Sequence, residues 1–263
     1  MLLISDLDGT LLDGEKKIPP KAVTAIQRFV DNGNRFTIAT GRTEDTCKIA
    51  TEFLPVNAPV ILYNGACIME LETKKVLFQR TISAKAFRPL INEVMEKFPD
   101  VCIEIFAYGP LILVNPEAIM DPYIIRENQP YRYMTLDETP DKWLKIMFSA
   151  SHDRLVEMEK ILDKWWPVLP DSRGFYSAEY YYEIVNDKCS KGECASFLSK
   201  HLNIPQNEIA AIGDHLNDVE VIKWVGHGYA PRNARREVKK YAKVLEHTND
   251  QEAICDMIEE LLR

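Results

Sequence analysis

Short apolar runs and longer amphipathic segments alternate at the start of the chain. The run Leu2–Ile4 predicts a buried strand that ends in a tight turn of small and acidic residues. An amphipathic helix is expected over about 19–33, and a second strand leads to Ala39. A helix over about 43–53 and a strand over 59–63 follow. This alternation predicts a parallel sheet covered by helices.

The same alternation returns near the C-terminus. A helix is expected from Lys191 to His201, and the apolar run 209–212 predicts a buried strand. The remaining predicted elements are a helix over 218–224, a short strand near 227–230, a helix from Ala234, a strand at 244–245 and a final helix through Leu261.

The middle of the chain does not keep this simple order. A hairpin over 67–79 leads to a helix from about Ser83, and helices and antiparallel-type strands then mix, ending in a Tyr-rich strand near 175–185. We therefore predict an α/β protein with a Rossmann-like parallel-sheet core, formed by residues 1–82 and 185–263. Residues 83–184 would form an inserted α+β domain.

Composition narrows the choice of partners. The 263 residues carry a formal net charge of -8, which disfavours nucleic acid and anionic membrane surfaces. No apolar run approaches the roughly 20 residues of a membrane span, and the N-terminus does not look like a signal peptide. The six cysteines form no Cys-x-x-Cys pair, so we expect reduced thiols in a cytoplasmic protein.

The first candidate for chemistry is the segment Asp6-Leu7-Asp8-Gly9-Thr10, directly after the first strand. In open α/β sheets, ligands bind at the carboxyl ends of the strands. Two carboxylates separated by one residue suit Mg²⁺, and they also suit a nucleophile beside a proton shuttle. Gly9 allows close approach of the backbone, and Thr10 offers a hydroxyl and an N–H. The alternative is an ordinary Asx turn.

Three further segments follow in order: Thr40-Gly41-Arg42 after the second strand, Ser190-Lys191-Gly192-Glu193 at a helix start, and Gly213-Asp214-His215-Leu216-Asn217-Asp218 after the strand 209–212. Together with the first segment, they resemble the four motifs of the haloacid dehalogenase superfamily of phosphatases. The order and the detail of the last segment are similar to the Cof-type branch, whose cap domain is inserted between the second and third motifs. The residues 83–184 would then be this cap.

The resemblance implies a two-step reaction. Asp6 would be the nucleophile that forms an aspartyl-phosphate, and Asp8 would protonate the leaving oxygen and then activate water. One Mg²⁺ would be held by Asp6, the backbone carbonyl of Asp8, and Asp214, although Asp214 after Gly213 could instead cap a helix. Lys191 lies at a helix start, where the dipole disfavours a cation, so a nearby anion explains it better.

The remaining motif residues each have an alternative role. Thr40 and the Gly41 N–H are expected to bind phosphate, with a helix N-cap as the alternative for Thr40. Asn217 could contact phosphate or lie next to the metal, while Asp218 could orient Lys191 or a metal-bound water. Four more residues are expected to be structural or peripheral: Arg42 points toward the cap or solvent, Asn64-Gly65 forms a turn near the site, and His215 is a loop side chain.

We therefore predict a Mg²⁺-dependent phosphatase for a small phosphorylated metabolite, most plausibly a sugar phosphate. The inserted segment carries 11 Lys or Arg against 17 Asp or Glu, which disfavours a polyanion. A phosphomutase or phosphotransferase would need a basic cluster there, whereas Arg126, Arg132 and Arg154 are scattered along the segment. A non-catalytic sensor of phosphorylated metabolites is the other alternative. The aromatic side chains either stack on substrate or, as we favour, pack a core: Phe175, Tyr176, Tyr180, Tyr181 and Tyr182.

Overall fold

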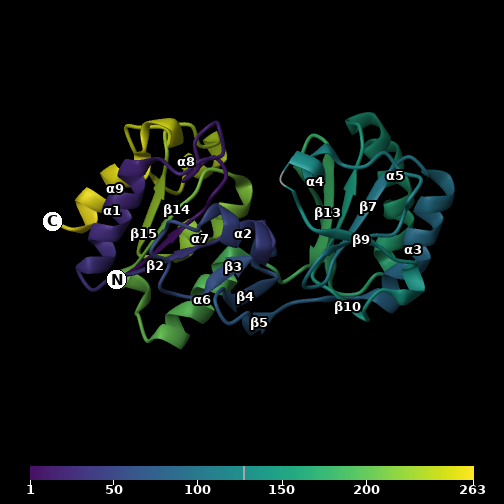
Figure 1. Cartoon of the computed structure of the whole chain (residues 1–263), viewed down its shortest axis with the longest axis horizontal. Helices are drawn as coiled ribbons and strands as arrows, with labels where there is room; N and C mark the ends of the chain where they lie inside the picture. Colours follow the sequence, from purple (N-terminus) through teal and green to yellow (C-terminus); the bar gives the residue numbers. More distant parts are fainter. Residues whose placement is uncertain (127) are drawn as a thin grey trace. The chain divides into compact units, whose positions relative to one another are not determined.

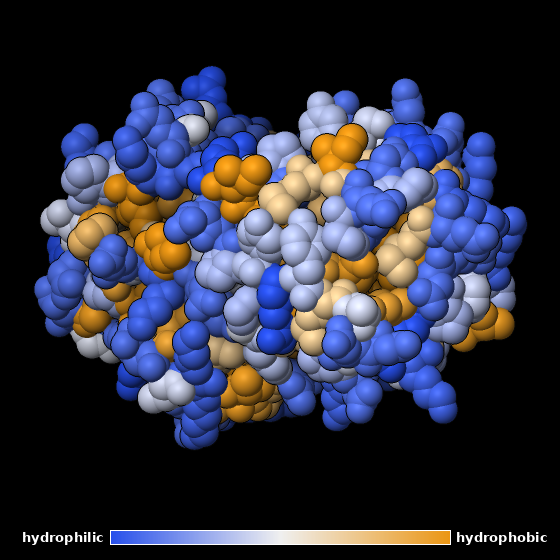
Figure 2. Space-filling view, turned by 45° about the vertical axis from the view of Figure 1, so that its right-hand side comes forward, coloured by the Kyte–Doolittle hydropathy of each residue, from blue (hydrophilic) through white to orange (hydrophobic). Residues whose placement is uncertain are grey.

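The computed structural model describes residues 1–126 and 128–263. Its backbone divides into two compact units (Figure 1). The core unit comprises Met1–Phe78 and Ser190–Arg263, and the inserted unit comprises Gln79–Cys189. No helix of the described residues is long and apolar enough to cross a membrane. The face shown in Figure 2 is mostly hydrophilic, with scattered hydrophobic groups, as expected for a chain with 27% charged residues.

The core unit is built on a five-stranded parallel sheet in the order β16-β15-β14-β1-β2. Its strands are β1 (Leu2–Ser5), β2 (Arg35–Ile38), β14 (Ile209–Ile212), β15 (His227–Ala230) and β16 (Lys243–Val244). All four residues of β1 are buried, as are all four of β14. Such continuous apolar strands are typical of a parallel sheet with both faces covered. The predicted α/β fold with a parallel-sheet core is confirmed.

Helices cover this sheet. Cys194, Leu198 and Ile222 pack on one face of β1 and β14 from α6 and α7, while α1 and α9 lie side by side on the other side of the sheet in Figure 1. The helices of the core unit are α1 (Pro20–Asp31), α2 (Glu44–Ala50), α6 (Lys191–Leu202), α7 (Val219–Trp224), α8 (Arg236–Lys239) and α9 (Ala253–Leu261). Its short 3-10 helices are η1 (Tyr63–Gly65), η4 (Gln206–Glu208), η5 (Leu216–Asp218) and η6 (Asn249–Gln251).

The third predicted strand, β3 (Val60–Leu62), belongs to a separate small sheet. It pairs antiparallel with β4 (Cys67–Glu70), and β5 (Lys75–Gln79) completes the order β3-β4-β5. The predicted hairpin is therefore confirmed. A parallel bridge between Ala39 and Ile61 joins this sheet to the end of β2. That bridge places the residues after β3 close to those after β2.

The inserted unit contains a six-stranded sheet in the order β12-β13-β11-β7-β8-β9. The residues Ile103, Ile105 and Phe148 on one face of it share a core with apolar side chains of α3 and α5. The strands of the unit are β6 (Ile82–Ser83), β7 (Cys102–Phe106), β8 (Leu111–Leu113), β9 (Tyr131–Tyr133), β10 (Lys142–Trp143), β11 (Lys145–Ser149), β12 (Ser172–Ala178) and β13 (Tyr181–Asn186). Its helices are α3 (Ala84–Lys97), α4 (Pro122–Arg126), α5 (His152–Trp165), η2 (Leu136–Glu138) and η3 (Trp166–Val168).

The prediction of a single Tyr-rich strand over 175–185 is wrong. The segment folds as a hairpin of β12 and β13, and Tyr180 lies in the turn between them with 55% of its surface exposed. Tyr182 is only 3% exposed and packs edge to face on Tyr176, with ring centroids 4.9 Å apart. Tyr176 and Tyr182 therefore belong to the core of the inserted unit, in agreement with the packing interpretation.

Candidate active site

The motifs meet at one edge of the core sheet. Asp6 directly follows β1, Thr40 follows β2 by two residues, and Asp214 follows β14 by two residues. Because β1 lies between β2 and β14 and all three run parallel, their carboxyl ends adjoin. Backbone bonds hold these ends in place, with the Asp6 N–H donating to the Ile212 carbonyl at 3.0 Å. Such an edge is the usual ligand site of an open α/β sheet.

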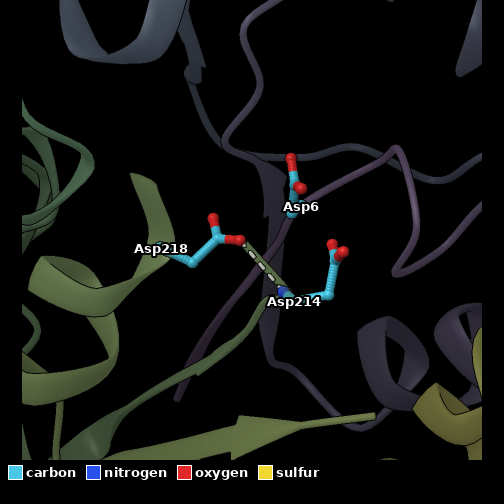
Figure 3. A group of neighbouring side chains, drawn as sticks. All are labelled: Asp6, Asp214 and Asp218. Atoms are coloured by element: carbon cyan, nitrogen blue, oxygen red, sulfur yellow. Dashed lines mark hydrogen bonds between the residues drawn. The ribbon is translucent and has the colours of Figure 1, made fainter. Parts of the chain in front are cut away.

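Three carboxylates gather there. One oxygen each of Asp6, Asp214 and Asp218 lies within 4.8 Å of the others (Figure 3). Asp6 and Asp218 are 7% and 1% exposed. Burial raises the pKa of Asp6 well above its ordinary value, although Lys191 opposes this shift. A group of oxygen ligands at this spacing fits a hard divalent cation. The structure thus brings two of the predicted metal ligands together and adds Asp218, which was not predicted as one.

Lys191 lies fully buried between two of these acids. Its Nζ contacts Asp6 Oδ1 at 2.9 Å and Asp218 Oδ1 at 2.6 Å. Burial alone would lower the pKa of Lys191, but the two carboxylates outweigh it and raise the pKa above its ordinary value. Lys191 is therefore an ammonium ion. It is the first residue of α6, whose N-cap Ser190 accepts a hydrogen bond from the Glu193 N–H at 2.9 Å.

Asp218 shapes the loop that carries Asp214. Its Oδ2 accepts the N–H groups of Asp214 and His215, both at 3.0 Å, and its Oδ1 contacts Lys191. A Cβ on Gly213 would lie 2.3 Å from Asp218 Cγ, so only glycine fits this turn. His215 caps η5 and is absent from the acid cluster. Of the two roles considered for Asp218, the structure thus shows the contact with Lys191.

Residues of the first motif support Asp214. The Thr10 hydroxyl donates to Asp214 Oδ1 at 2.8 Å. Gly9 has φ of +79°, and a Cβ there would lie 2.6 Å from Asp214 Oδ2. The backbone of the first motif can therefore lie this close to the Asp214 side chain only because residue 9 is glycine.

Asp8 has different surroundings from Asp6. Its carboxylate accepts two hydrogen bonds from Arg42, through Nε and Nη2 at 2.9 Å each, and a third from Lys16 at 2.8 Å. Burial opposes ionisation of Asp8, but Arg42 and Lys16 lower its pKa to about 2. The expectation that Arg42 points toward the cap or solvent is therefore wrong. Its side chain is only 8% exposed, and its guanidinium forms a bidentate ion pair with the Asp8 carboxylate.

The segment after β2 is also buried. Thr40 is 1% exposed, and its hydroxyl accepts a hydrogen bond from the Arg42 N–H at 3.2 Å. The N-cap of α2 is Thr43, so the alternative that Thr40 caps this helix is wrong. Binding of phosphate by Thr40 and Gly41 stays a prediction.

Asn217 contacts a residue outside the four motifs. Its Nδ2 donates to Asn64 Oδ1 at 2.8 Å, while its own Oδ1 is buried and has no partner among the described residues. Sequence reasoning did not predict the contacts that Asn64, Arg42 and Lys16 make with motif residues. It predicted the Asn64-Gly65 turn, but nothing in the local sequence indicates that Asn64 contacts Asn217.

Comparison with known proteins agrees with this geometry. A model of the family described as haloacid dehalogenase-like hydrolase matches residues 3–258. The chain belongs to this family. Phosphatase YwpJ of Bacillus subtilis is 28% identical over 99% of both chains. The predicted superfamily is therefore confirmed.

Solved structures of the family share the fold. A haloacid dehalogenase-like hydrolase from Bacteroides thetaiotaomicron has a TM-score of 0.87 at 24% identity, covering 99% of this chain and 98% of that one. A sugar phosphatase of subclass IIB has a TM-score of 0.79 at 17% identity and covers 98% of each chain. At these identities the likeness concerns the fold alone.

Proposed function

We propose that this hydrolase is a phosphatase that cleaves a small phosphate monoester through an aspartyl-phosphate on Asp6. The observation that carries the proposal is the placement of the Asp6 carboxylate against the buried ammonium of Lys191, at the carboxyl end of the central strand. Phosphoryl transfer depends chiefly on positioning and on neutralising charge, and a fixed cation beside a carboxylate supplies both. The phosphatase name of the Bacillus subtilis relative supports this activity.

Asp8 is suited to moving a proton at the leaving oxygen. It lies two residues beyond Asp6, and its ion pairs with Arg42 and Lys16 keep it ionised at neutral pH. A carboxylate is the form that activates water in the second step. In the first step, the oxygens of a bound ester compete for the same two cations, and loss of these contacts makes Asp8 easier to protonate.

The charge of the site supports a requirement for Mg²⁺. Its carboxylates outnumber its cationic side chains. The carboxylates belong to Asp6, Asp8, Asp214 and Asp218, and the cations to Lys16, Arg42 and Lys191. A phosphate dianion would add to this negative surplus. When bound, Mg²⁺ supplies the missing positive charge and polarises phosphoryl oxygens. Asp6, Asp214 and the Asp8 carbonyl would hold it, with Asp218 close by.

A small phosphorylated metabolite, in particular a sugar phosphate, is the proposed substrate class. The inserted unit would act as the cap that selects it, which agrees with the acidic surplus of this segment and with the sugar phosphatase among proteins of similar fold. The turn residue Tyr180 is exposed and available for such a contact. Six cysteines without a Cys-x-x-Cys pair agree with reduced thiols and a cytoplasmic location.

A screen of phosphorylated sugars, nucleotides, glycolate and pyridoxal phosphate with Mg²⁺ tests this function through release of inorganic phosphate. Asp6→Asn should lower turnover by more than the roughly 10⁴-fold upper range of one acid–base group, while Asp31→Asn on the exposed face of α1 should not. Hydrolysis by folded Asp6→Asn protein would exclude Asp6 as the nucleophile. No turnover of any ester would favour a sensor.

A further inference from the structure

The turn after β3 has an unusual backbone. Tyr63, Asn64 and Gly65 have consecutive φ values of 52°, 56° and 95°. Left-handed conformations are unfavourable for side chains other than glycine, least so for asparagine, and a bulky tyrosine there is rare. Such a turn persists only when its surroundings hold it in place. The contacts of this left-handed turn, residues 63–65, therefore identify the segments that stabilise it and that it positions.

Its backbone is tied to the segment after β2. The Asn64 N–H donates to the Thr40 carbonyl at 3.0 Å, and the Tyr63 N–H donates to the Arg42 carbonyl at 3.2 Å. The Tyr63 hydroxyl donates to the buried carboxylate of Glu44 at the start of α2. Both ends of the segment that carries Thr40 and Gly41 are thus attached to the turn.

The same turn contacts the start of α6. A Cβ on Gly65 would lie 2.5 Å from the backbone carbon and oxygen of Ser190, so residue 65 has no room for a side chain. The Cys194 thiol of α6 donates to the Gly65 carbonyl at 3.3 Å. Lys191 follows Ser190 directly, so the turn also sets the position from which its ammonium reaches Asp6.

The side chain of Asn64 completes the connection. Its Oδ1 accepts the Nδ2 of Asn217 at 2.8 Å, and a Cβ on Gly41 would lie 3.0 Å from the same oxygen. An asparagine amide can face a partner with either its oxygen or its nitrogen, and the partner decides which. An acceptor at Asn64 makes Asn217 present its nitrogen there. One Nδ2 hydrogen of Asn217 then remains for donation to a phosphate oxygen, while its Oδ1 is buried without a partner among the described residues.

We infer that Asn64 is a positioning residue that fixes the amide of Asn217, while the left-handed turn holds the segment after β2 and the start of α6 in register with it. Asn64 lies outside the four motifs and bonds to the last of them through the side chain of Asn217, so we assign its effect to that contact. The inference rests on the proposed phosphatase function, because it assigns Asn217 to the binding of the phosphoryl group.

The test is a double-mutant cycle on the Mg²⁺-loaded full-length protein. Glycine adopts a φ of 56° without strain, so Asn64→Gly removes the side chain and keeps the turn. Asn203→Gly is the matched control, because Asn203 has φ of 54° at the opposite end of α6 from Lys191. We expect Asn64→Gly to lower kcat/KM for para-nitrophenyl phosphate about tenfold, as for loss of one hydrogen bond, with Asn203→Gly within twofold of wild type.

Coupling separates positioning from a merely structural role. If Asn64 acts through Asn217, the double variant Asn64→Gly/Asn217→Ala should be no slower than Asn217→Ala alone. Multiplied losses, or an unchanged Asn64→Gly variant, would overturn the inference. Calorimetric binding of inorganic phosphate to the same proteins gives a readout without turnover and should show the same coupling. Wild-type protein that binds phosphate but hydrolyses no ester would contradict the proposed function. The coupling measured by phosphate binding would then decide this inference. Wild-type protein that neither binds phosphate nor hydrolyses any ester would overturn both.

Discussion

Replacing Lys191 by methionine should destabilise the core unit strongly. Methionine keeps the length and the apolar stem but removes the ammonium, and Lys191 is fully buried against Asp6 and Asp218. At an effective dielectric constant of about 20, two opposite charges at these distances attract by about 6 kcal/mol per pair. Much of this is offset by the cost of burying the ammonium. Breaking a buried ion pair by removing one partner typically costs about 3–5 kcal/mol, which is the loss we expect.

The assay is urea denaturation followed by circular dichroism, in EDTA so that no divalent cation takes the place of the ammonium. Because two compact units can unfold separately, the loss should appear in the transition of the core unit. Lys200→Met, on the exposed side of the same helix, should change the free energy of unfolding by no more than about 0.5 kcal/mol. Lys191→Met/Asp6→Asn should recover part of the loss, since it removes one of the two uncompensated carboxylates.

Two results would refute this reasoning. A loss below about 1 kcal/mol for Lys191→Met would mean that the ion pairs contribute little beyond the desolvation of the ammonium. A double variant no more stable than Lys191→Met would mean that the loss comes from packing of the side chain and not from buried charge. If Lys191→Met does not fold at all, the comparison between the double variant and Asp6→Asn alone still measures the contribution of the lysine.

Three further outcomes are expected. Excess EDTA should abolish ester hydrolysis and Mg²⁺ should restore it, and full activity in EDTA would contradict the metal site. Burial and the neighbouring Asp121 raise the pKa of Glu104 well above its ordinary value, so wild-type stability should fall as pH rises through that pKa. Glu104→Gln should lack this fall, which is at most about 1.4 kcal/mol per pH unit. If the free energy of unfolding changes equally with pH in both proteins from pH 5 to 8, the assignment to Glu104 is refuted. Tyr182→Ala should cost about 3–5 kcal/mol, whereas Tyr180→Ala should stay within about 0.5 kcal/mol, and similar thermal shifts would refute the hairpin assignment.

Sequence reasoning located the candidate site from the architecture of parallel sheets. Apolar runs before Asp6, Thr40 and Asp214 marked three strands, and parallel strands bring their carboxyl ends to one edge whatever the rest of the chain does. Lys191 could be added because a cation at a helix start requires an explanation. These inferences depend on local pattern and on one general rule of architecture, so they did not require knowledge of long-range contacts.

The contacts that sequence reasoning missed are those between side chains that no local pattern relates. Arg42 is 34 residues from Asp8, and Asn64 is 153 residues from Asn217. The Tyr-rich hairpin was missed for a different reason. Its turn at Glu179-Tyr180 contains no glycine, proline or asparagine, so the pattern continued through it as one strand.

The two carboxylates of the first motif illustrate why such contacts matter for chemistry. Asp6 and Asp8 share one loop, yet burial raises the pKa of Asp6 and the contacts with Arg42 and Lys16 lower that of Asp8. Their spacing fixes only that both lie at the end of β1. Residues from other segments decide their protonation, because a buried carboxylate is stabilised by whichever cation reaches it. A carboxylate paired with a buried ammonium, beside a second carboxylate held by Arg42 and Lys16, is therefore a property of the folded chain as a whole. It follows that changing Arg42 should alter the protonation of Asp8 while leaving the ion pair of Asp6 intact.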